Sequence, residues 1–336
     1  MAVTITDIAA KAGVSRSMVS RALTGSGPVK PQKKEEIIAL ARAMGYAPNQ
    51  AALHLRHAKS YMIGLYFSTI SQSTSPYVLH SVLTGAYSAI EKRYQIAVKG
   101  IDQHEAGSLN PSQYDGLLIM SQWDMDLDFL EEAASLEIPM VAISRRVPID
   151  IPVVTTDEQG GMKDAMSYLL DCGHRHIGII EGPPNLEATL LRHFGWIQAV
   201  KEHGLSHDQF PVAYGNYRYR SGYQAANQLM NQHPGLTALL CFNDEMAVGA
   251  KNALARRGLQ VPKDVSLIGY DNLELPRYAD LQLTSVERNA YQIAVEGARM
   301  LMHYIEDGVR PPDLELKNRL VIRESVKTQN LYVKSP

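Results

Sequence analysis

The sequence predicts a small all-α module followed by a larger α/β body whose parallel sheets are covered by helices on both faces. Three features of the 336 residues support this prediction. Apolar residues recur at helical spacing through the first 46 residues, whereas short apolar runs alternate with amphipathic stretches from residue 61 onward. The two parts also differ in the sign of their charge. A chain of this length can form one small module and two medium domains.

Residues 4–23 predict two short helices joined by a tight turn. Thr4 can cap the first helix, with Asp7 three positions later, and Gly13 suits the positive φ that such a turn needs. Ser15 can cap the second helix, whose outward positions carry short polar and guanidinium groups, as major-groove reading requires. Those outward positions are Arg16, Ser17, Ser20 and Arg21. The alternative is an ordinary helical hairpin with a solvated basic face.

Charge separates the two parts of the chain. Residues 1–60 contain nine Lys or Arg and three acidic residues, which gives a net charge of +6. The whole chain has a net charge of −2, so residues 61–336 carry −8. Such asymmetry is typical of a protein that contacts a polyanion through its N-terminal module alone.

A third helix is expected from Pro31 to Met44, ended by Gly45, although Lys30 is a weak cap. In the segment that follows, residues 47–60, about two helical turns can form, which are too few to be stable alone. Such a segment would be ordered by a partner such as DNA. A flexible linker is the other interpretation. The two are compatible, because a linker can be flexible in the free protein and become helical on DNA.

From residue 61 the pattern is that of a doubly wound parallel α/β fold, in which ligands bind at the carboxyl ends of the strands. The expected strands are residues 62–67, 95–101, 116–120, 139–144, 153–157, 176–182, 238–242 and 265–271. The expected helices are about residues 76–93, 159–172, 187–203, 219–232, 244–257 and 289–306.

Composition and motifs exclude several classes of protein. The sequence has neither a signal-peptide pattern nor an apolar run of membrane-spanning length, so we expect a cytoplasmic protein with no membrane partner. Cys172 and Cys241 could form a disulfide, but free, buried thiols fit better, and no spacing resembles a zinc site. No P-loop, H-E-x-x-H, G-x-S-x-G or dinucleotide fingerprint occurs. We therefore predict a protein that is not an enzyme and that uses no metal or cofactor.

The motif series T-x-x-D-I-A, A-G-V-S and V-S-R-A-L, then G-Y-x-P-N-x-A-A-x-x-L and K-S-x-x-I-G-L, resembles the lac repressor family of bacterial transcription factors. The resemblance implies a helix-turn-helix headpiece and a core of two doubly wound lobes, like periplasmic sugar-binding proteins. It also implies crossings between the lobes near residues 157–160, 287–290 and 318–322. The implied boundaries are headpiece 1–46, hinge helix or linker 47–60 and core 61–336, with an N-lobe of about 61–157 and 290–318 and a C-lobe of about 158–287 and 320–330.

The same resemblance implies a homodimer that binds a near-palindromic double-stranded operator. Base-reading positions of the family fall on Arg16, Ser17 and Arg21, and Leu55 matches a hinge residue that wedges into the minor groove. The expected DNA-binding set is completed by Thr4, Ser15, Ser20 and Asn49. The C-terminal residues show no heptad repeat, which favours a dimer over a tetramer.

An effector pocket is expected between the lobes. Arg192, Asn243 and Asp271 follow apolar strands or lie in cleft-facing loops, and Tyr217 matches a family position that places an aromatic ring against the ligand. Helix capping for Asp271 and turn chemistry for Asn243 are the alternative roles. Ser68, at the end of the first lobe strand, is a weaker candidate.

Three departures from the family pattern bear on the pocket and its surroundings. Many sugar-responsive members have Asp at the position of Ser144, which Arg145 and Arg146 follow here, and Ala290 stands where some have an aromatic ring. A wider, more positive pocket that admits a phosphorylated sugar or another anion is one interpretation; an outward salt bridge for Arg146 is the other. Residues 102–115 lack a helical period and leave a sheet face thinly covered, which would permit an unusual subunit contact or cause local instability.

The predicted function is a DNA-binding transcriptional regulator, expected to be a repressor, whose operator affinity is switched by a sugar or sugar derivative bound between the lobes. Two alternatives remain at this point. One is a DNA-binding regulator controlled by a protein co-regulator, and the other is a sugar-binding protein that does not bind DNA.

Overall fold

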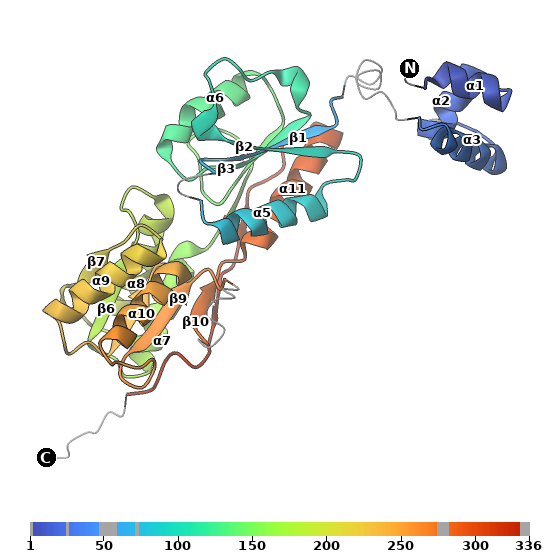
Figure 1. Cartoon of the computed structure of the whole chain (residues 1–336). Coiled ribbons are helices and arrows are strands. Elements are labelled where there is room, and N and C mark those ends of the chain that lie inside the picture. Colours follow the sequence, from blue (N-terminus) through green and yellow to red (C-terminus); the bar gives the residue numbers. More distant parts are fainter. Residues whose placement is uncertain (1–2, 25–26, 47–58, 71–73, 274–281, 330–336) are drawn as a thin grey trace, which may run out of the picture. The chain divides into compact units, whose positions relative to one another are not determined.

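The computed structural model describes residues 3–24, 27–46, 59–70, 74–273 and 282–329. The chain divides into two compact units, Met1–Ser60 and Tyr61–Pro336, each of which is described by itself. Figure 1 shows the helical first unit in blue and the two sheets of the second unit.

The headpiece contains three helices, α1 (Ile5–Ala12), α2 (Arg16–Thr24) and α3 (Pro31–Ala43). The predicted capping box is present, because the Asp7 backbone N–H donates to Thr4 Oγ1 at 3.3 Å and the Thr4 backbone N–H donates to Asp7 Oδ2 at 2.8 Å. Gly13 ends α1 with a φ of 65°. The helices meet in a small buried core made of Ile8, Ala9, Val19, Ala22, Ile37 and Ala41. The predicted helix-turn-helix is confirmed.

The second unit contains two six-stranded sheets, each of which forms one lobe. The N-lobe sheet has the order β11-β5-β4-β3-β1-β2, and the C-lobe sheet has the order β12-β10-β9-β8-β6-β7. The pairs are parallel except β10–β12. The N-lobe strands are β1 (Met62–Phe67), β2 (Gln95–Gly100), β3 (Gly116–Met120), β4 (Met140–Ile143), β5 (Val153–Thr156) and β11 (Leu314–Leu316). The C-lobe strands are β6 (Ile177–Glu181), β7 (Val212–Tyr214), β8 (Ala238–Cys241), β9 (Ser266–Tyr270), β10 (Thr284–Glu287) and β12 (Arg319–Val321).

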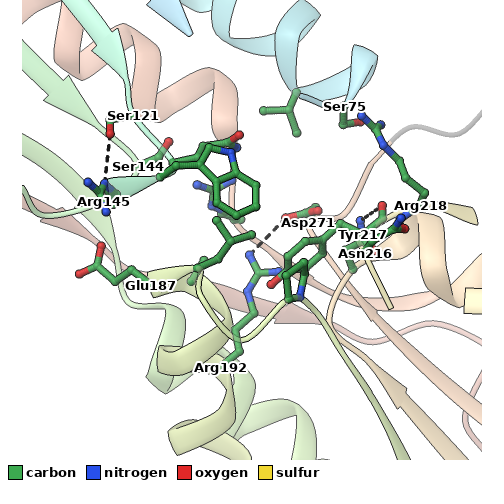
Figure 2. A pocket seen from close by; sticks show the side chains of 18 residues that line it. Ser75, Ser121, Ser144, Arg145, Glu187, Arg192, Asn216, Tyr217, Arg218 and Asp271 are labelled. Atoms are coloured by element: carbon green, nitrogen blue, oxygen red, sulfur yellow. Dashed lines mark hydrogen bonds and ion pairs between the residues drawn. The ribbon is translucent and has the colours of Figure 1, made fainter. Parts of the chain in front are cut away.

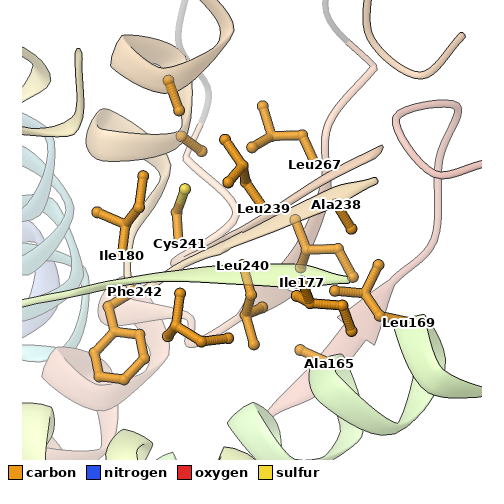
Figure 3. Packing of buried hydrophobic residues seen from close by; sticks show 14 of the residues in the cluster. Ala165, Leu169, Ile177, Ile180, Ala238, Leu239, Leu240, Cys241, Phe242 and Leu267 are labelled. Atoms are coloured by element: carbon orange, nitrogen blue, oxygen red, sulfur yellow. The ribbon is translucent and has the colours of Figure 1, made fainter. Parts of the chain in front are cut away.

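Helices cover these sheets on both faces, so the predicted doubly wound fold is confirmed. Along the N-lobe strands, alternate residues pack against α5 (Pro76–Ala89) and α11 (Ala290–Asp307) on one face and against α6 (Leu127–Ser135) on the other. In the C-lobe, Leu169 of α7 (Glu158–Asp171) lies beside Ile177 on one face of the sheet, while Leu239 points to the opposite face (Figure 3). The other described helices of the C-lobe are α8 (Glu187–Glu202), α9 (Tyr219–Gln232) and α10 (Asp244–Arg256).

The polypeptide passes between the two sheets at three places. It leaves β5 of the N-lobe at Thr156 and enters α7 of the C-lobe, and it returns between Glu287 and Ala290. It crosses once more between β11, which ends at Leu316, and β12, which begins at Arg319. The carboxyl ends of the central strands of both sheets therefore border the same region.

The segment between β2 and β3 has no α-helix, as predicted, and contains only the 3₁₀ turns Ile101–Gln103 and Pro111–Gln113. Leu109 and Tyr114 from this segment are buried against the sheet. The edge strand β2 nevertheless stays open, since Val98 is 37% exposed. The thin cover is thus restricted to the sheet edge, and a subunit contact there stays a prediction.

Both cysteines are free, but only Cys241 is buried; Cys172 is half-buried, so the expectation of two buried thiols is wrong for it. Burial raises the pKa of the Cys241 thiol. Within the described ranges, no helix has the length and apolar character to cross a bilayer, and no group of His, Cys, Asp and Glu is arranged to hold a metal ion.

Candidate DNA interface and effector pocket

The second helix of the headpiece presents a basic N-terminal end. Arg16 and Ser17 are exposed in its first turn, and Ser15 caps it by accepting the Met18 backbone N–H at 3.2 Å. The half-buried Arg21 lies one turn further on and donates from Nε to the Ser17 carbonyl at 3.2 Å. This contact keeps the Arg21 guanidinium on the same side of the helix as Ser17. The arrangement fits a helix that enters the major groove by its N-terminal end.

Ser20 is placed differently from the prediction for the DNA-binding residues. Its side chain is only 6% exposed, so the expectation that it faces outward is wrong. It directly follows the buried Val19, and its small hydroxymethyl group fits among the packed headpiece helices. Thr4 is exposed, but its hydroxyl group is used in the helix cap. Asn49 and Leu55 lie outside the described residues.

A cavity of about 270 Å³ lies between the two lobes and brings together four of the five predicted effector contacts. Arg192, Tyr217, Asn243 and Asp271 all line it, and the labelled side chains in Figure 2 come from both lobes. The remaining lining residues are Ser75, Val78, Ser121, Gln122, Trp123, Ser144, Arg145, Pro183, Leu186, Glu187, Ala188, Asn216, Arg218 and Arg288.

A buried carboxylate holds two of the arginines in place. Arg192 Nε donates to Glu158 Oε2 at 2.8 Å, and Arg288 Nε lies 2.7 Å from Glu158 Oε1. The Glu158 side chain is 2% exposed. Burial by itself would raise the pKa of Glu158, but the two guanidinium groups lower it to about 2. Arg192 therefore enters the cavity wall in a fixed orientation, with its guanidinium 3.8 Å from the centre of the Tyr270 ring.

Asp271 stands opposite this arginine. Its Oδ1 is 3.6 Å from Arg192 Nη2, a separation too long for a direct hydrogen bond but short enough for both groups to bind one ligand hydroxyl. Burial raises the pKa of Asp271 to about 6, and Arg192 limits that rise. Asp271 has a φ of 101°, and Tyr217 and Ser144 on the cavity wall also have positive φ, at 64° and 83°. Strained backbone of this kind is concentrated at functional sites.

Tyr217 and Asn243 are positioned by each other. Asn243 Nδ2 donates to the Tyr217 carbonyl at 2.9 Å, while Asn243 Oδ1 accepts the Met246 backbone N–H and caps α10. The Tyr217 hydroxyl is 2.7 Å from Thr189 Oγ1, which fixes the ring. Both polar atoms of the Asn243 side chain are hydrogen-bonded, so its role in the turn and helix cap explains this residue without a ligand. The Tyr217 ring remains available as an apolar surface for a ligand.

Ser68 does not line the cavity, so its prediction as an effector contact is wrong. It is buried, donates to Asp126 Oδ2 at 2.5 Å and accepts the Gln122 backbone N–H at 2.7 Å. Asp126 Oδ2 also accepts Ser121 Oγ and the backbone N–H groups of Gln122 and Trp123. Ser68 thus belongs to a network that holds the loop after β3, and this loop forms part of the cavity wall.

Known proteins resemble both units of this chain. Residues 4–49 match the bacterial regulatory proteins of the lacI family, and residues 166–326 match the periplasmic binding protein-like domain. The chain is 35% identical over 328 residues to the probable HTH-type transcriptional repressor ExuR of Bacillus subtilis, covering 97% of this chain and 98% of that protein. The chain belongs to the lacI family.

Solved structures agree with this assignment. A CelR–cellobiose complex is similar with a TM-score of 0.72 and 28% identity, covering 96% of this chain and 99% of that one. The lac repressor dimer bound to operator and an anti-inducer has the same fold, with a TM-score of 0.81 at 24% identity, and covers 97% of this chain and 100% of its own. This regulator therefore has the predicted headpiece and periplasmic-binding-protein-like core.

The two arginines that follow Ser144 in this lacI-family regulator have different surroundings. Arg145 lines the cavity, whereas the Arg146 side chain is 56% exposed and lies within 3.6 Å of Asp313 and 3.5 Å of Glu315. Arg146 therefore forms the predicted outward salt bridge, and of these two arginines Arg145 alone adds positive charge to the pocket.

Sequence reasoning missed the contacts that join the lobes across the cavity. Ser75 Oγ, at the start of α5, donates to Glu245 Oε1 at 2.6 Å, and Arg218 Nη2 donates to the Thr74 carbonyl at 3.1 Å. On the other lobe boundary, the Arg146 backbone N–H donates to Glu187 Oε2 at 3.1 Å. The sequence places Ser75 after a Ser/Thr-rich segment and before a predicted helix, which indicates a helix start but not a partner in the other lobe.

The buried Asp244 beside the pocket predicts a pH-dependent stability of the regulator. Burial and the nearby Asp271 carboxylate raise its pKa to about 7, from 3.8. A carboxyl group whose pKa is higher in the folded state than in the unfolded state binds its proton more tightly when the protein is folded. Its contribution to stability is complete below the unfolded-state pKa and is lost as the pH rises through the folded-state pKa. We expect Asp244 to lower the free energy of unfolding by about 1.4 kcal/mol between pH 6 and pH 8.

Urea titrations at pH 6 and pH 8 measure this loss. Asp244→Asn should remove most of it, because the amide mimics the protonated acid toward Ser285 Oγ, at 2.6 Å, and the Leu273 backbone N–H, at 2.7 Å. Asp128→Asn, at an exposed position of α6, is the control and should leave the pH dependence intact. An unchanged slope in the Asp244 variant would contradict the assignment.

Proposed function

We propose that this chain is a transcriptional regulator whose affinity for double-stranded operator DNA is changed by a sugar or sugar derivative bound between the lobes of its core. In this proposal residues 1–46 read DNA, residues 47–60 form the hinge and residues 61–336 bind the effector and form the homodimer. The protein acts in the cytoplasm and is not an enzyme. Asn49 and Leu55 keep their predicted DNA contacts.

The cavity is the observation on which this proposal depends. It is at the small end of ligand pockets, as a one-ring molecule requires, and it combines the Tyr217 ring with the Arg192 and Asp271 side chains. Paired charged groups suit neighbouring hydroxyls, and the aromatic ring suits an apolar ring face. A relative of the same fold, CelR, forms a complex with the carbohydrate cellobiose, which supports a carbohydrate ligand here.

The lobes also offer a way to transmit binding. A molecule held by both lobes changes the balance between open and closed arrangements of the core, as far as its affinities for the two arrangements differ. A tenfold change in operator affinity requires a difference of about 1.4 kcal/mol. The lobe-bridging contacts of Ser75 and Arg218 are part of that balance.

Asp271 provides the test of the effector site. A panel of sugars and sugar phosphates is screened by thermal shift, and operator binding is measured by fluorescence anisotropy with and without each ligand that binds. Asp271→Ala should abolish the effect of the ligand on operator binding while the affinity without ligand stays within about twofold. A variant that still responds normally would show that the pocket is misassigned.

Arg16 provides the test of the DNA interface. Replacing it by Ala should weaken specific operator binding by about 1–3 kcal/mol and relax preference at one base pair, because a guanidinium group bound to a guanine edge is lost. The operator is selected from a random duplex library and variants are compared by anisotropy. Lys34→Ala, at an exposed position of α3, should cause only a small loss that is equal for all sequences. Equal losses on specific and non-specific DNA for Arg16→Ala would refute its role.

A further inference from the structure

Arg145 is a buried arginine on the cavity wall with one unsatisfied nitrogen. It follows the strained Ser144 at the end of β4 and is 8% exposed. Its Nε donates to Ser121 Oγ at 3.1 Å and its Nη1 donates to Asp124 Oδ1 at 2.7 Å. Its Nη2 is buried and has no hydrogen-bond partner in the part of the chain that the structure describes. A buried, charged donor without a partner is costly, so its retention in a binding cavity indicates a ligand atom.

The charge of Arg145 is also less compensated than that of its neighbours in the cavity. Arg192 and Arg288 share the buried Glu158 carboxylate. The partner of Arg145 is Asp124, whose side chain is 91% exposed, so water screens their attraction. A buried positive charge whose hydrogen-bonded carboxylate lies in solvent favours an anion on the cavity side.

Ser121, Ser144 and Arg145 lie together at one side of the cavity, away from Ser75 and Arg218 (Figure 2). Of the two acidic residues that line the cavity, Glu187 and Asp271, Glu187 lies on this side (Figure 2). It accepts the Arg146 backbone N–H, and burial raises its pKa.

We propose that the effector is a one-ring sugar derivative with an oxyanion, a carboxylate or a phosphate, and that Arg145 binds this group. This inference rests on the proposed effector function of the cavity and names the class of effector. A neutral hydroxyl would satisfy the Nη2 hydrogen bond but would leave the buried charge unbalanced. An oxyanion does both, and the guanidinium group is well suited to it. Arg192 and Asp271 then bind hydroxyls on the other part of the ring.

The test uses the full-length protein and isothermal titration calorimetry with matched probes. These are hexoses, the corresponding hexuronates and the corresponding hexose 6-phosphates, which differ only at one carbon. At least one acidic probe should bind roughly 10- to 100-fold more tightly than its neutral counterpart. The uronate and phosphate arms distinguish the two sources of the oxyanion.

Two variants decide whether Arg145 is responsible. Arg145→Gln should remove most of the preference for the acidic probe while changing the affinity for the neutral probe little. Arg146→Gln is the matched control, because its side chain is exposed and pairs outside the cavity, and it should keep the preference. Retention of the preference in Arg145→Gln overturns the assignment.

The outcomes also separate this inference from the proposed function. A neutral hexose that binds at least as tightly as both acids, and that changes operator binding, overturns the oxyanion inference and leaves the sugar-responsive function intact. If no probe of any class binds to the protein, the proposed effector function fails and the inference fails with it.

Discussion

Replacing Glu158 by Ala is expected to lower the free energy of unfolding of the core by about 3–5 kcal/mol. The change leaves the buried guanidinium groups of Arg192 and Arg288 without their shared carboxylate. Removing one partner of a buried ion pair destabilises the folded state far more than replacing both partners by apolar residues, because the remaining charge stays buried without a counter-charge. Glu158→Gln should also destabilise, since an amide offers one acceptor where two arginines need one each.

Urea unfolding followed by tryptophan fluorescence measures this effect. Both tryptophans, Trp123 and Trp196, lie in the core, so the signal reports on that unit alone. Glu296→Ala is the control, because Glu296 pairs with the 61% exposed Arg299 at the surface, and its loss should stay below about 1 kcal/mol. Similar losses for the Glu158 and Glu296 variants would show that the buried network contributes no more than a surface pair.

Replacing Gly182 by Ala should weaken effector binding by roughly 10- to 100-fold, through about 1–3 kcal/mol of overpacking. A Cβ at this position would lie 2.3 Å from Cζ of Tyr217. The ring has little freedom to move away, because its hydroxyl is bonded to Thr189 and its backbone carbonyl to Asn243. Relief of the clash therefore pushes the ring into the cavity or breaks those bonds.

Calorimetry with the ligand identified in the sugar screen checks this expectation. Gly235→Ala is a matched control, since its Cβ would have no heavy atom within 4 Å and its backbone does not have positive φ. The affinity for operator without effector should be the same in both variants. If Gly182→Ala binds the effector like the natural protein, Tyr217 does not form part of the binding surface.

Much of the fold was predictable because its strands are buried on both faces. Continuous apolar runs such as residues 62–67 and 116–120 therefore identified strands directly, and their ends coincide with β1 and β3. The elements that were missed are short or lie at sheet edges. Strands β7, β11 and β12 have three residues each, and α6 has nine. Segments this short do not show a recognisable hydrophobic periodicity.

The candidate site was predictable where a polar residue directly follows a strand, as Asp271 follows β9. It was not predictable where a role arises from pairing across the fold. Glu158 acts through Arg192 and Arg288, and Ser75 acts through Glu245 in the other lobe. Ser20 illustrates the opposite error, because polarity alone predicted exposure while a small hydroxyl can be packed inside.

The repeated crossing between lobes determines the order in which the core can be completed during synthesis. One face of the N-lobe sheet is covered by Ile293, Ala294 and Leu301 of α11. The ribosome makes that helix only after the entire stretch of residues 158–287, most of the C-lobe, has emerged. The nascent N-lobe, which has only α5 on that face, therefore keeps part of it uncovered throughout that interval. Until the last helix covers this apolar surface, it can bind chaperones or aggregate.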